Sequence, residues 1–284
     1  MTPRLSIDQC ATLACLLEAT APKVGNVHRG ADFANLTFTD FAASAVAIDP
    51  AMEAAIHTGI GQAVRDAVAA TRAVVSTNTN LGMALLIAPL AAVPHEVPLS
   101  PAAVSKVLSQ LSADDCRLVY EAIRLAQPGG MGHVKSMDVA NEPPNDLLAA
   151  MRLASDRDLI ARQYVEDFRL VLTDALPCLI AGRKKGWSLT ETIVHAHLSL
   201  IAQHGDSLIA RKCGPELAAK AAILARQTLD RGQPGDDAYY EAVSDFDFWL
   251  RADGNRRNPG TTADLIAAAL FAGLRDGQLP PPWR

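Results

Sequence analysis

Aromatic residues and sheet-like patterns are scarce in this sequence. Phe, Tyr and Trp make up only 5% of its 284 residues, and no segment alternates polar and apolar side chains between hairpin turns. These absences argue against a β-sandwich or barrel, because strands are enriched in aromatic and β-branched residues. Ala and Leu are abundant, bring the hydrophobic share to 49% and favour packed helices. We predict an all-α fold, a single compact multi-helix bundle domain over residues 1–284.

The sequence also lacks the features typical of nucleic-acid binding, zinc sites and membrane spans. The formal net charge is -5 and the basic run is confined to Arg183–Lys185, so we predict no nucleic-acid partner. The five cysteines form no C-x-x-C pair and no zinc spacing, which fits a reducing cytoplasm. The longest apolar run, Met83–Val93, is too short to cross a bilayer, so we predict no membrane span and a cytoplasmic protein.

Common catalytic fingerprints are absent as well. The sequence has no Walker A motif, no Rossmann glycine fingerprint and no nucleophile elbow. Their absence disfavours the commonest kinase, dehydrogenase and hydrolase sites and leaves the reaction to be inferred from other polar segments.

Apolar periodicity and cap residues place the helices. Ser100 with Pro101, and the pairs Ser112/Asp115 and Ser188/Glu191, predict helix starts, whereas Thr39 is expected to cap a short helix. The other predicted helices cover 6–20, 56–75, 83–92, one continuous stretch from 158 to 181, 215–230, 236–251 and 262–275. Residues 128–157 are the best candidate for a linker or a functional loop.

Four polar, glycine-containing segments interrupt this apolar helical pattern. They are residues 22–26, 78–82, 204–212 and 258–264. Glycine lets the backbone approach a ligand, and exposed N–H groups at a following helix start favour phosphate oxygens. These segments are therefore where we expect a site that cradles a polyphosphate.

The last segment has two interpretations. Thr261 with Asp264 matches a capping box, which would explain the segment by folding alone. Alternatively, the Thr261 and Thr262 hydroxyls face a phosphate or a ribose, and Asp264 holds magnesium directly or through water.

The segment at 204–212 combines charges of both signs. Asp206 is a candidate magnesium ligand, and Arg211 and Lys212 could offset phosphate charge. His204 is a candidate proton shuttle. The alternative is a solvated charged cluster at a helix end.

Two earlier segments carry further polar groups. Lys23, Gly25 and Asn26 form a loop one turn after Glu18, and a surface turn is the alternative. In the second segment, Asn78 and Asn80 flank a threonine before Gly82 and offer amide groups to a ribose or a base edge, although asparagines are also common turn residues.

Several isolated residues complete the candidates. Arg124 could reach a phosphate and Asp138 is a third candidate carboxylate for the metal, but both could be surface ion-pair residues. His195 and His197 are two apart and point to different helix faces, so we reject a zinc pair.

The order of the segments then points to one family. From the start of the chain to its end they read EATAPKVGNVHRGADF, NTNLG, YEAIRLAQPGGMG, HGDSLIARKCG and NPGTTADLIAAALF. Together, over nearly the whole chain, they resemble the triphosphoribosyl-dephospho-CoA synthase family of the CitG type. Residues on the family's motif positions are Lys23, Gly25, Asn26, Asn80, Gly82, Asp206, Arg211 and Asp264.

The resemblance implies an all-α enzyme that transfers the 5-triphosphoribosyl group of ATP to the 2'-hydroxyl of 3'-dephospho-CoA and releases adenine. Magnesium would be held by Asp206, Asp264 and Asp138, and the base near the acceptor hydroxyl would be Glu18 or His204. The small-molecule partners would be ATP and dephospho-CoA or another acceptor, and a homodimer is one possible assembly.

Two departures keep alternatives open. The family's citrate-lyase-associated members have His-Lys where this chain has Asn80-Leu81, and their Thr-His-Gly-Glu stretch is missing here. A related ribosyl or phosphoribosyl transferase with another acceptor in one-carbon cofactor biosynthesis therefore stays open. So do a magnesium-dependent enzyme like the ADP-ribosyl hydrolases and a non-enzymatic helical ligand-binding protein.

Overall fold

The described part of the chain is helical. This computed structural model describes residues 4–129, 139 and 141–283, and Asp138 therefore lies outside the described residues. Within those ranges there is no β-strand, only the isolated bridges His28–Ala31 and Phe33–Leu36. The prediction of an all-α fold is confirmed.

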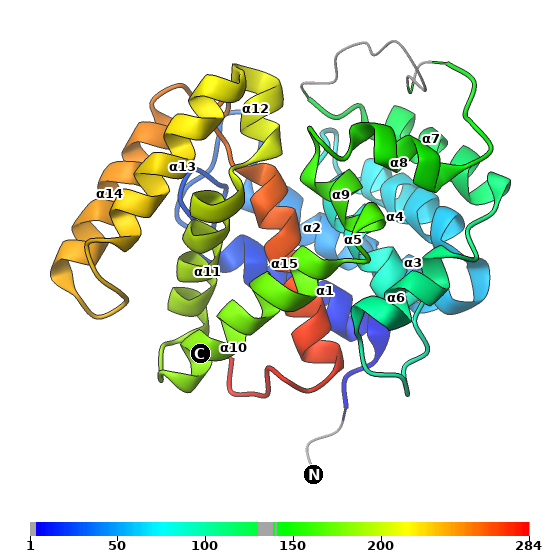
Figure 1. The fold of residues 1–284 in the computed structure, drawn as a ribbon, viewed down its shortest axis with the longest axis horizontal. Coiled ribbons are helices and arrows are strands. Elements are labelled where there is room, and N and C mark those ends of the chain that lie inside the picture. The colour runs from blue at the N-terminus through cyan, green and yellow to red at the C-terminus, as the bar shows by residue number, and fades with distance from the viewer. Residues whose placement is uncertain (1–3, 130–138, 140, 284) are drawn as a thin grey trace.

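The helices of the first half of the chain begin with α1, which packs against α2 and α3 (Figure 1). They are α1 (Ile7–Thr20), α2 (Phe38–Ala47), α3 (Asp49–Thr58), α4 (Ile60–Val74), α5 (Leu81–Ala91), α6 (Pro101–Leu108), α7 (Ala113–Ala126) and α8 (Leu147–Ala154). The second half continues with α9 (Leu159–Val165), a π-helical turn η1 (Leu170–Ala175), α10 (Leu176–Lys184), α11 (Leu189–His204), α12 (Ser207–Cys213), α13 (Pro215–Leu229), α14 (Asp237–Arg251) and α15 (Gly260–Arg275).

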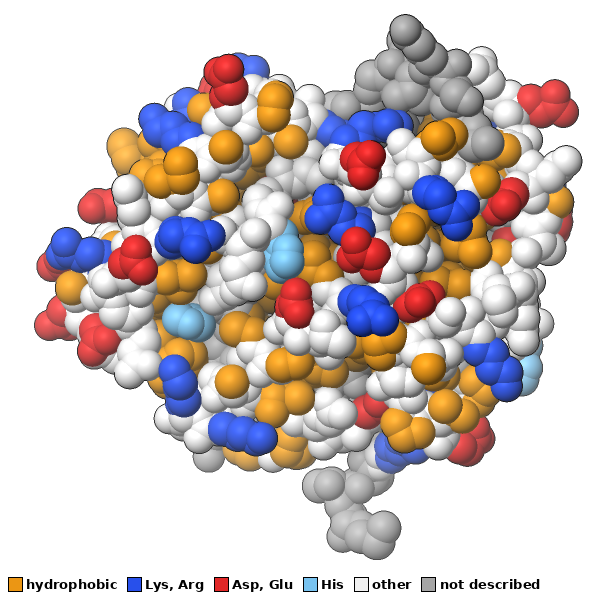
Figure 2. All heavy atoms as spheres, in the orientation of Figure 1, with side chains coloured by type: hydrophobic (Ala, Val, Ile, Leu, Met, Phe, Trp, Pro, Cys, Tyr) orange, Lys and Arg blue, Asp and Glu red, His pale blue; other side chains and the backbone are white. Residues whose placement is uncertain are grey.

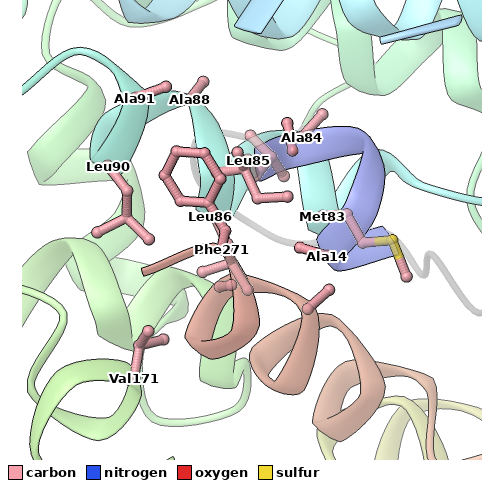
Figure 3. Close-up of a cluster of buried hydrophobic side chains, with 14 of the residues drawn as sticks. Ala14, Met83, Ala84, Leu85, Leu86, Ala88, Leu90, Ala91, Val171 and Phe271 are labelled. Atoms are coloured by element: carbon pink, nitrogen blue, oxygen red, sulfur yellow. The ribbon is translucent and has the colours of Figure 1, made fainter. Parts of the chain in front are cut away.

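The last helix, α15, is the centre of the main core. Figure 1 shows it between the two halves of the molecule, and Figure 3 shows Phe271 of α15 among side chains of α5, with Ala14 and Val171 nearby. Phe271, Leu86 and Ala14 are all inaccessible to solvent. A helix that is apolar on all sides is stable only when it is covered on all sides, which explains the position of α15.

A second, smaller core lies between α11, α12, α13 and α14. Ile209, Tyr239 and Leu250 are buried in it, together with Val24 from the loop after α1. The two faces of α11 take part in different cores, Leu200 in the main one and Leu198 in the second. Helix α11 therefore contributes side chains to both hydrophobic cores and connects them.

The predicted caps at Ser100, Ser112 and Ser188 are confirmed, but two predicted helix extents are wrong. The helix expected over 56–75 is interrupted at Gly59, whose φ of 86° ends α3 before α4 begins. Gly61 then packs against the start of α7, where a Cβ would lie 2.4 Å from the Asp115 Cα. The close contact between α4 and α7 therefore requires glycine at residue 61. The start of α2 is also corrected, since Thr37 and not Thr39 is its cap.

The helix expected from 158 to 181 is broken as well. After α9, Asp167 and Phe168 adopt positive φ, and the chain resumes as η1 and α10. The fully buried Gln163 spans the break, since its side chain donates to the Leu159 carbonyl at 3.1 Å and accepts from the Val171 N–H at 3.3 Å. Apolar periodicity continues through this break, so the sequence pattern did not reveal it.

Two segments predicted as loops contain helices. α8 lies within residues 128–157, and α12 follows Asp206 in the segment 204–212. The Thr261/Asp264 capping box is also wrong, because α15 begins at Gly260 after Pro259 and has no side-chain cap from its own N-cap residue. Among the described helices, none is long and apolar enough to cross a membrane.

Candidate functional site

One cavity of about 730 Å³ gathers most of the residues singled out in the sequence. It is bordered by α5, α7, α8, α9, α12 and α15, at the junction of the two halves of the molecule. The sequence-predicted residues that line it are Glu18, Asn26, Asn78, Asn80, Gly82, Arg211, Lys212, Thr261 and Asp264. Segments almost 250 residues apart in the chain therefore share one surface.

The starts of four helices face this cavity. Gly82 lies in the first turn of α5, Ile160 in that of α9, Leu208 in that of α12 and Thr261 in that of α15, and all four line the cavity. The N-terminal end of a helix carries partial positive charge, so convergent helix starts favour an anionic ligand.

Asp206 links two of these starts. Its Oδ1 accepts the N–H groups of Leu208 and Ile209 at 2.9 Å, and its Oδ2 accepts the Thr262 N–H and hydroxyl at 2.8 Å. Asp206 is only 2% exposed and does not line the cavity. Its carboxylate caps α12 and α15 together, so its oxygens are already occupied by donors and the expectation of a metal-binding or catalytic Asp206 loses its geometric basis.

Asp264 has the opposite environment. It lines the cavity, and none of the described residues donates a hydrogen bond to its carboxylate. Burial, and then the neighbouring charges of Glu18 and Asp206, raise the pKa of Asp264 well above the usual value, while Arg211 opposes that shift. A carboxyl group with a strongly perturbed pKa in a cavity is typical of a functional site.

Gly82 is required by the position of Asp264. A Cβ at residue 82 would lie 2.0 Å from Asp264 Oδ2 and 2.8 Å from Ile160 Cδ1. No side chain fits at residue 82, so glycine brings the start of α5 directly against the Asp264 carboxylate. Both residues were predicted as site residues, and the structure brings them together.

Glu18 forms a buried ion pair with Lys23. Lys23 Nζ lies 2.8 Å from Glu18 Oε1, and the side chains are 0% and 3% exposed. Nζ also donates to the Glu18 carbonyl, whereas none of the described residues donates a hydrogen bond to Glu18 Oε2. Burial raises the pKa of Glu18, and the lysine charge opposes this shift. Glu18 reaches the cavity, but Lys23 does not, so Lys23 can act on a ligand only through Glu18.

Two cations that line the cavity, Arg211 and Lys212, lie on α12. Arg211 forms an ion pair with Asp158, while its buried Nε has no hydrogen-bond partner among the described residues. Lys212 Nζ donates to the Asn255 carbonyl at 3.2 Å, and burial lowers its pKa. The sequence analysis did not single out Asp158 as a site residue, although its position at the start of a predicted helix was a signal. Its Oδ1 caps α9.

The asparagines of the site are largely fixed by the fold. Asn80 Nδ2 donates to Thr71 Oγ1 at 2.9 Å, and Asn78 Oδ1 accepts the Leu81 N–H at 3.1 Å. Asn26 Nδ2 donates to Asn258 Oδ1 at 2.5 Å, and Asn26 Oδ1 is buried with no donor among the described residues. Asn258, a lining residue that we had not identified individually, thus ties the first polar segment to the last.

The remaining predicted residues are not brought to the cavity surface. Gly25 has φ 69°, its N–H donates to Asp247, and it packs against α14. Thr262 is fully buried against Asp206. His204 Nε2 lies 3.3 Å from Asp174, and Arg124 donates to the Val139 and Asn141 carbonyls; neither lines the cavity. The roles expected for His204 and Arg124 thus have no support from geometry.

Metal ligands are sparse in the described residues. Within them, no group of three or more His, Cys, Asp or Glu side chains is arranged to hold a metal ion. Mg²⁺, however, is commonly bound through one or two carboxylates and the phosphates of its nucleotide. Asp264, with no hydrogen-bond donor on its carboxylate, fits that role. The visible face in Figure 2 carries interspersed acidic and basic side chains without a continuous basic patch.

Comparisons with known proteins agree on the family. Residues 4–280 match the family described as CitG, ATP:dephospho-CoA triphosphoribosyl transferase. A crystal structure from Archaeoglobus fulgidus, described provisionally as a triphosphoribosyl-dephospho-CoA synthase, is similar to this chain with a TM-score of 0.63 and 24% identity. The similarity covers 85% of this chain and 99% of that one, and shows the shared fold. No match was found among curated proteins.

Proposed function

The chain belongs to the CitG family of ATP:dephospho-CoA triphosphoribosyl transferases, and we propose that the cavity at the start of α15 is where it transfers the triphosphoribosyl group. The observation that carries this proposal is the convergence of Asn26, Asn80, Arg211 and Thr261 on one cavity. A helical scaffold whose polar loops were only turns has no reason to gather them.

We assign the triphosphate of ATP to the convergent helix starts and to α12. The first turns of α5 and α15 offer backbone N–H groups, and Arg211 and Lys212 supply positive charge. Arg211 is held in place by Asp158, so little conformational freedom is lost when it binds a phosphate. A triphosphate bound at these groups fixes the ribose that is to be transferred.

Mg²⁺ is assigned to Asp264 together with the triphosphate oxygens. Asp264 offers a carboxylate that none of the described residues neutralises by a direct ion pair or hydrogen bond, at the point where helix starts converge. When bound, the ion would offset phosphate charge and orient the triphosphate. Asp206 is excluded from this role in our proposal because its oxygens already hold α12 and α15 in place.

Glu18 is assigned to the reacting centre. The reaction forms a bond between the acceptor 2'-oxygen and the ribose anomeric carbon and breaks the bond from that carbon to adenine. Positive charge develops on the ribose as adenine leaves, and an ionised carboxylate stabilises it. Glu18 Oε2 is free of donors among the described residues and takes the hydroxyl proton, while adenine leaves with a proton from the medium. The charge of Lys23 opposes the burial that raises the pKa of Glu18 and so favours the ionised form.

The direct test is adenine release. The protein is incubated with ATP, Mg²⁺ and dephospho-CoA, and adenine is followed by chromatography together with the mass of the product. We expect adenine and triphosphoribosyl-dephospho-CoA in equal amounts, and both should vanish when EDTA replaces Mg²⁺. Adenine release only with a different ribosyl acceptor would move the substrate assignment, and none with any acceptor would refute transferase activity. A homodimer remains a prediction, to be tested by light scattering.

A further inference from the structure

One part of the cavity wall, contributed by α7 and α8, is mainly apolar. We call it the α7–α8 lobe and define it by Val119, Ile123, Leu147, Ala150 and Met151, which line the cavity from α7 and α8. All five side chains are aliphatic, and Val119, Leu147 and Met151 are at most 8% exposed. The lobe is therefore an apolar part of the wall, in a cavity whose lining elsewhere mixes apolar side chains with amides and cations.

Tyr120 of α7 and Gln127, which follows this helix, also line the cavity, but most of its polar groups come from elsewhere. The amides of Asn78, Asn80 and Asn258 and the cations of α12 come from other segments. One more cation adjoins the lobe, because Arg157 follows α8 after three residues and also lines the cavity. The lining thus combines amides for bases and sugars, cations for phosphates and a separate aliphatic surface.

The two substrates differ in whether they contain an aliphatic portion. ATP consists of base, sugar and phosphates only. Dephospho-CoA adds a pantetheine arm, with methylene groups and a geminal dimethyl, joined through a pyrophosphate to its adenosine. We propose, building on the function above, that the α7–α8 lobe binds the pantetheine arm of the acceptor and that Arg157 lies beside its pyrophosphate.

The wall of the lobe argues against an adenine in this position. A nucleobase presents polar edges that need donors and acceptors, and the five defining side chains have none. Methylene and methyl groups, in contrast, gain free energy when aliphatic surface covers them. Met151 adds an unbranched side chain that adapts to an irregular ligand. The lobe therefore matches the one aliphatic portion found in either substrate.

Ala150 allows the lobe to be filled without removing a functional group. Ala150→Leu adds bulk on the lining side of α8, and Ala149→Leu makes the same change at a residue of α8 that does not line the cavity. The probe is phosphopantetheine, which carries the arm without the adenosine. Its binding is measured by calorimetry, which needs no turnover, and its inhibition is measured against each substrate.

We expect phosphopantetheine to bind the unmodified protein and to compete with dephospho-CoA but not with ATP. Ala150→Leu should weaken this binding and raise the KM for dephospho-CoA by about 10-fold or more, the scale on which an apolar pocket discriminates by one or two carbons. It should leave the KM for ATP within about twofold, and Ala149→Leu should change neither value.

Three results would overturn the inference. They are competition of phosphopantetheine with ATP, a rise in the KM for ATP alone in Ala150→Leu, and no binding of phosphopantetheine to a protein that releases adenine. Absence of adenine release by the unmodified protein would instead count against the proposed function, because phosphopantetheine binding is scored separately.

Discussion

The last turn of α1 and the N-terminal half of α15 each bring a carboxyl group, Glu18 and Asp264, to the same cavity, and the surroundings of the two groups differ. Glu18 is paired with a lysine that is wholly buried beside it, whereas Asp264 has no direct cationic partner or hydrogen-bond donor among the described residues. Lys23 therefore offsets part of the cost of burying the Glu18 charge, whereas the charge of Asp264 is left to be stabilised by a ligand. An unsatisfied charge of this kind is costly for folding and is retained where function needs it.

The largest effect on this difference between Glu18 and Asp264 is expected when Lys23, the partner of Glu18, is replaced. Lys23→Met should leave the Glu18 carboxyl buried without its cation and lower the free energy of unfolding by about 3–5 kcal/mol. Urea unfolding followed by circular dichroism measures the change. Adenine release should also fall, since Glu18 would lose the charge that keeps it ionised.

A double variant separates the ion pair from simple loss of packing. Glu18→Gln combined with Lys23→Met removes both charges, so most of the lost stability should return while the catalytic activity stays low. If the double variant were as unstable as Lys23→Met alone, the pairing would not explain the effect.

Asp264→Asn tests the carboxyl group that has no cationic partner among the described residues. It should reduce adenine release by about 10² to 10³-fold, because the amide binds Mg²⁺ and offsets charge poorly. At pH values above the folded pKa of Asp264, the same change should raise stability by about 1 kcal/mol, since an uncompensated charge in the cavity is removed. Opposite signs for activity and stability are the expected outcome; a loss of both would assign Asp264 a structural role.

The pH dependence sharpens this prediction. Burial raises the pKa of Asp264 in the folded state above its value in the unfolded chain. The folded protein therefore prefers the protonated group, and stability is lost as the pH rises through the folded pKa. The stability gained by Asp264→Asn should be full above the folded pKa and shrink as the pH falls below it. Thermal unfolding at a series of pH values measures it, and a gain independent of pH would contradict the raised pKa.

The close approach of α5 to Asp264 gives a steric prediction. Gly82→Ala places a Cβ 2.0 Å from Asp264 Oδ2 and must displace the carboxylate or the helix. We expect a loss of about 1–3 kcal/mol in stability and a clear fall in kcat/KM. Gly30→Ala is the matched control, because its Cβ would meet only the His28 ring, at 3.4 Å. Equal behaviour of the two variants would show that the contact at Gly82 is unimportant.

The smallest predicted effect concerns the cations. Arg211→Gln should raise the KM for ATP by about 10-fold, the scale of one lost hydrogen bond to a charged group, with little change in stability. Arg256→Gln is the control, because this side chain is 65% exposed and does not line the cavity. Steady-state kinetics with ATP varied provides the measurement, and an unchanged KM in Arg211→Gln would remove Arg211 from the phosphate site.

Residues close in sequence were the ones whose structure could be predicted. The caps at Ser112 and Ser188 involve groups three residues apart, so local pattern was sufficient. The break at Phe168 and the start of α15 were missed because distant residues decide them. Asp206, 56 positions before Thr262, supplies the cap, whereas the capping box of Thr261 and Asp264 was one of two interpretations of that segment.

The sequence by itself determined an all-helical chain with polar corners and named most of the residues that line the cavity, because composition, periodicity and motif order are local properties. Only the tertiary structure decided which candidates face a ligand. In the folded chain Lys23 forms an ion pair with Glu18, Asp206 caps the starts of α12 and α15, and Asp264 lines the cavity. The reason is physical, since a carboxylate's role depends on the charges and donors around it, and here these come from segments far away in the chain.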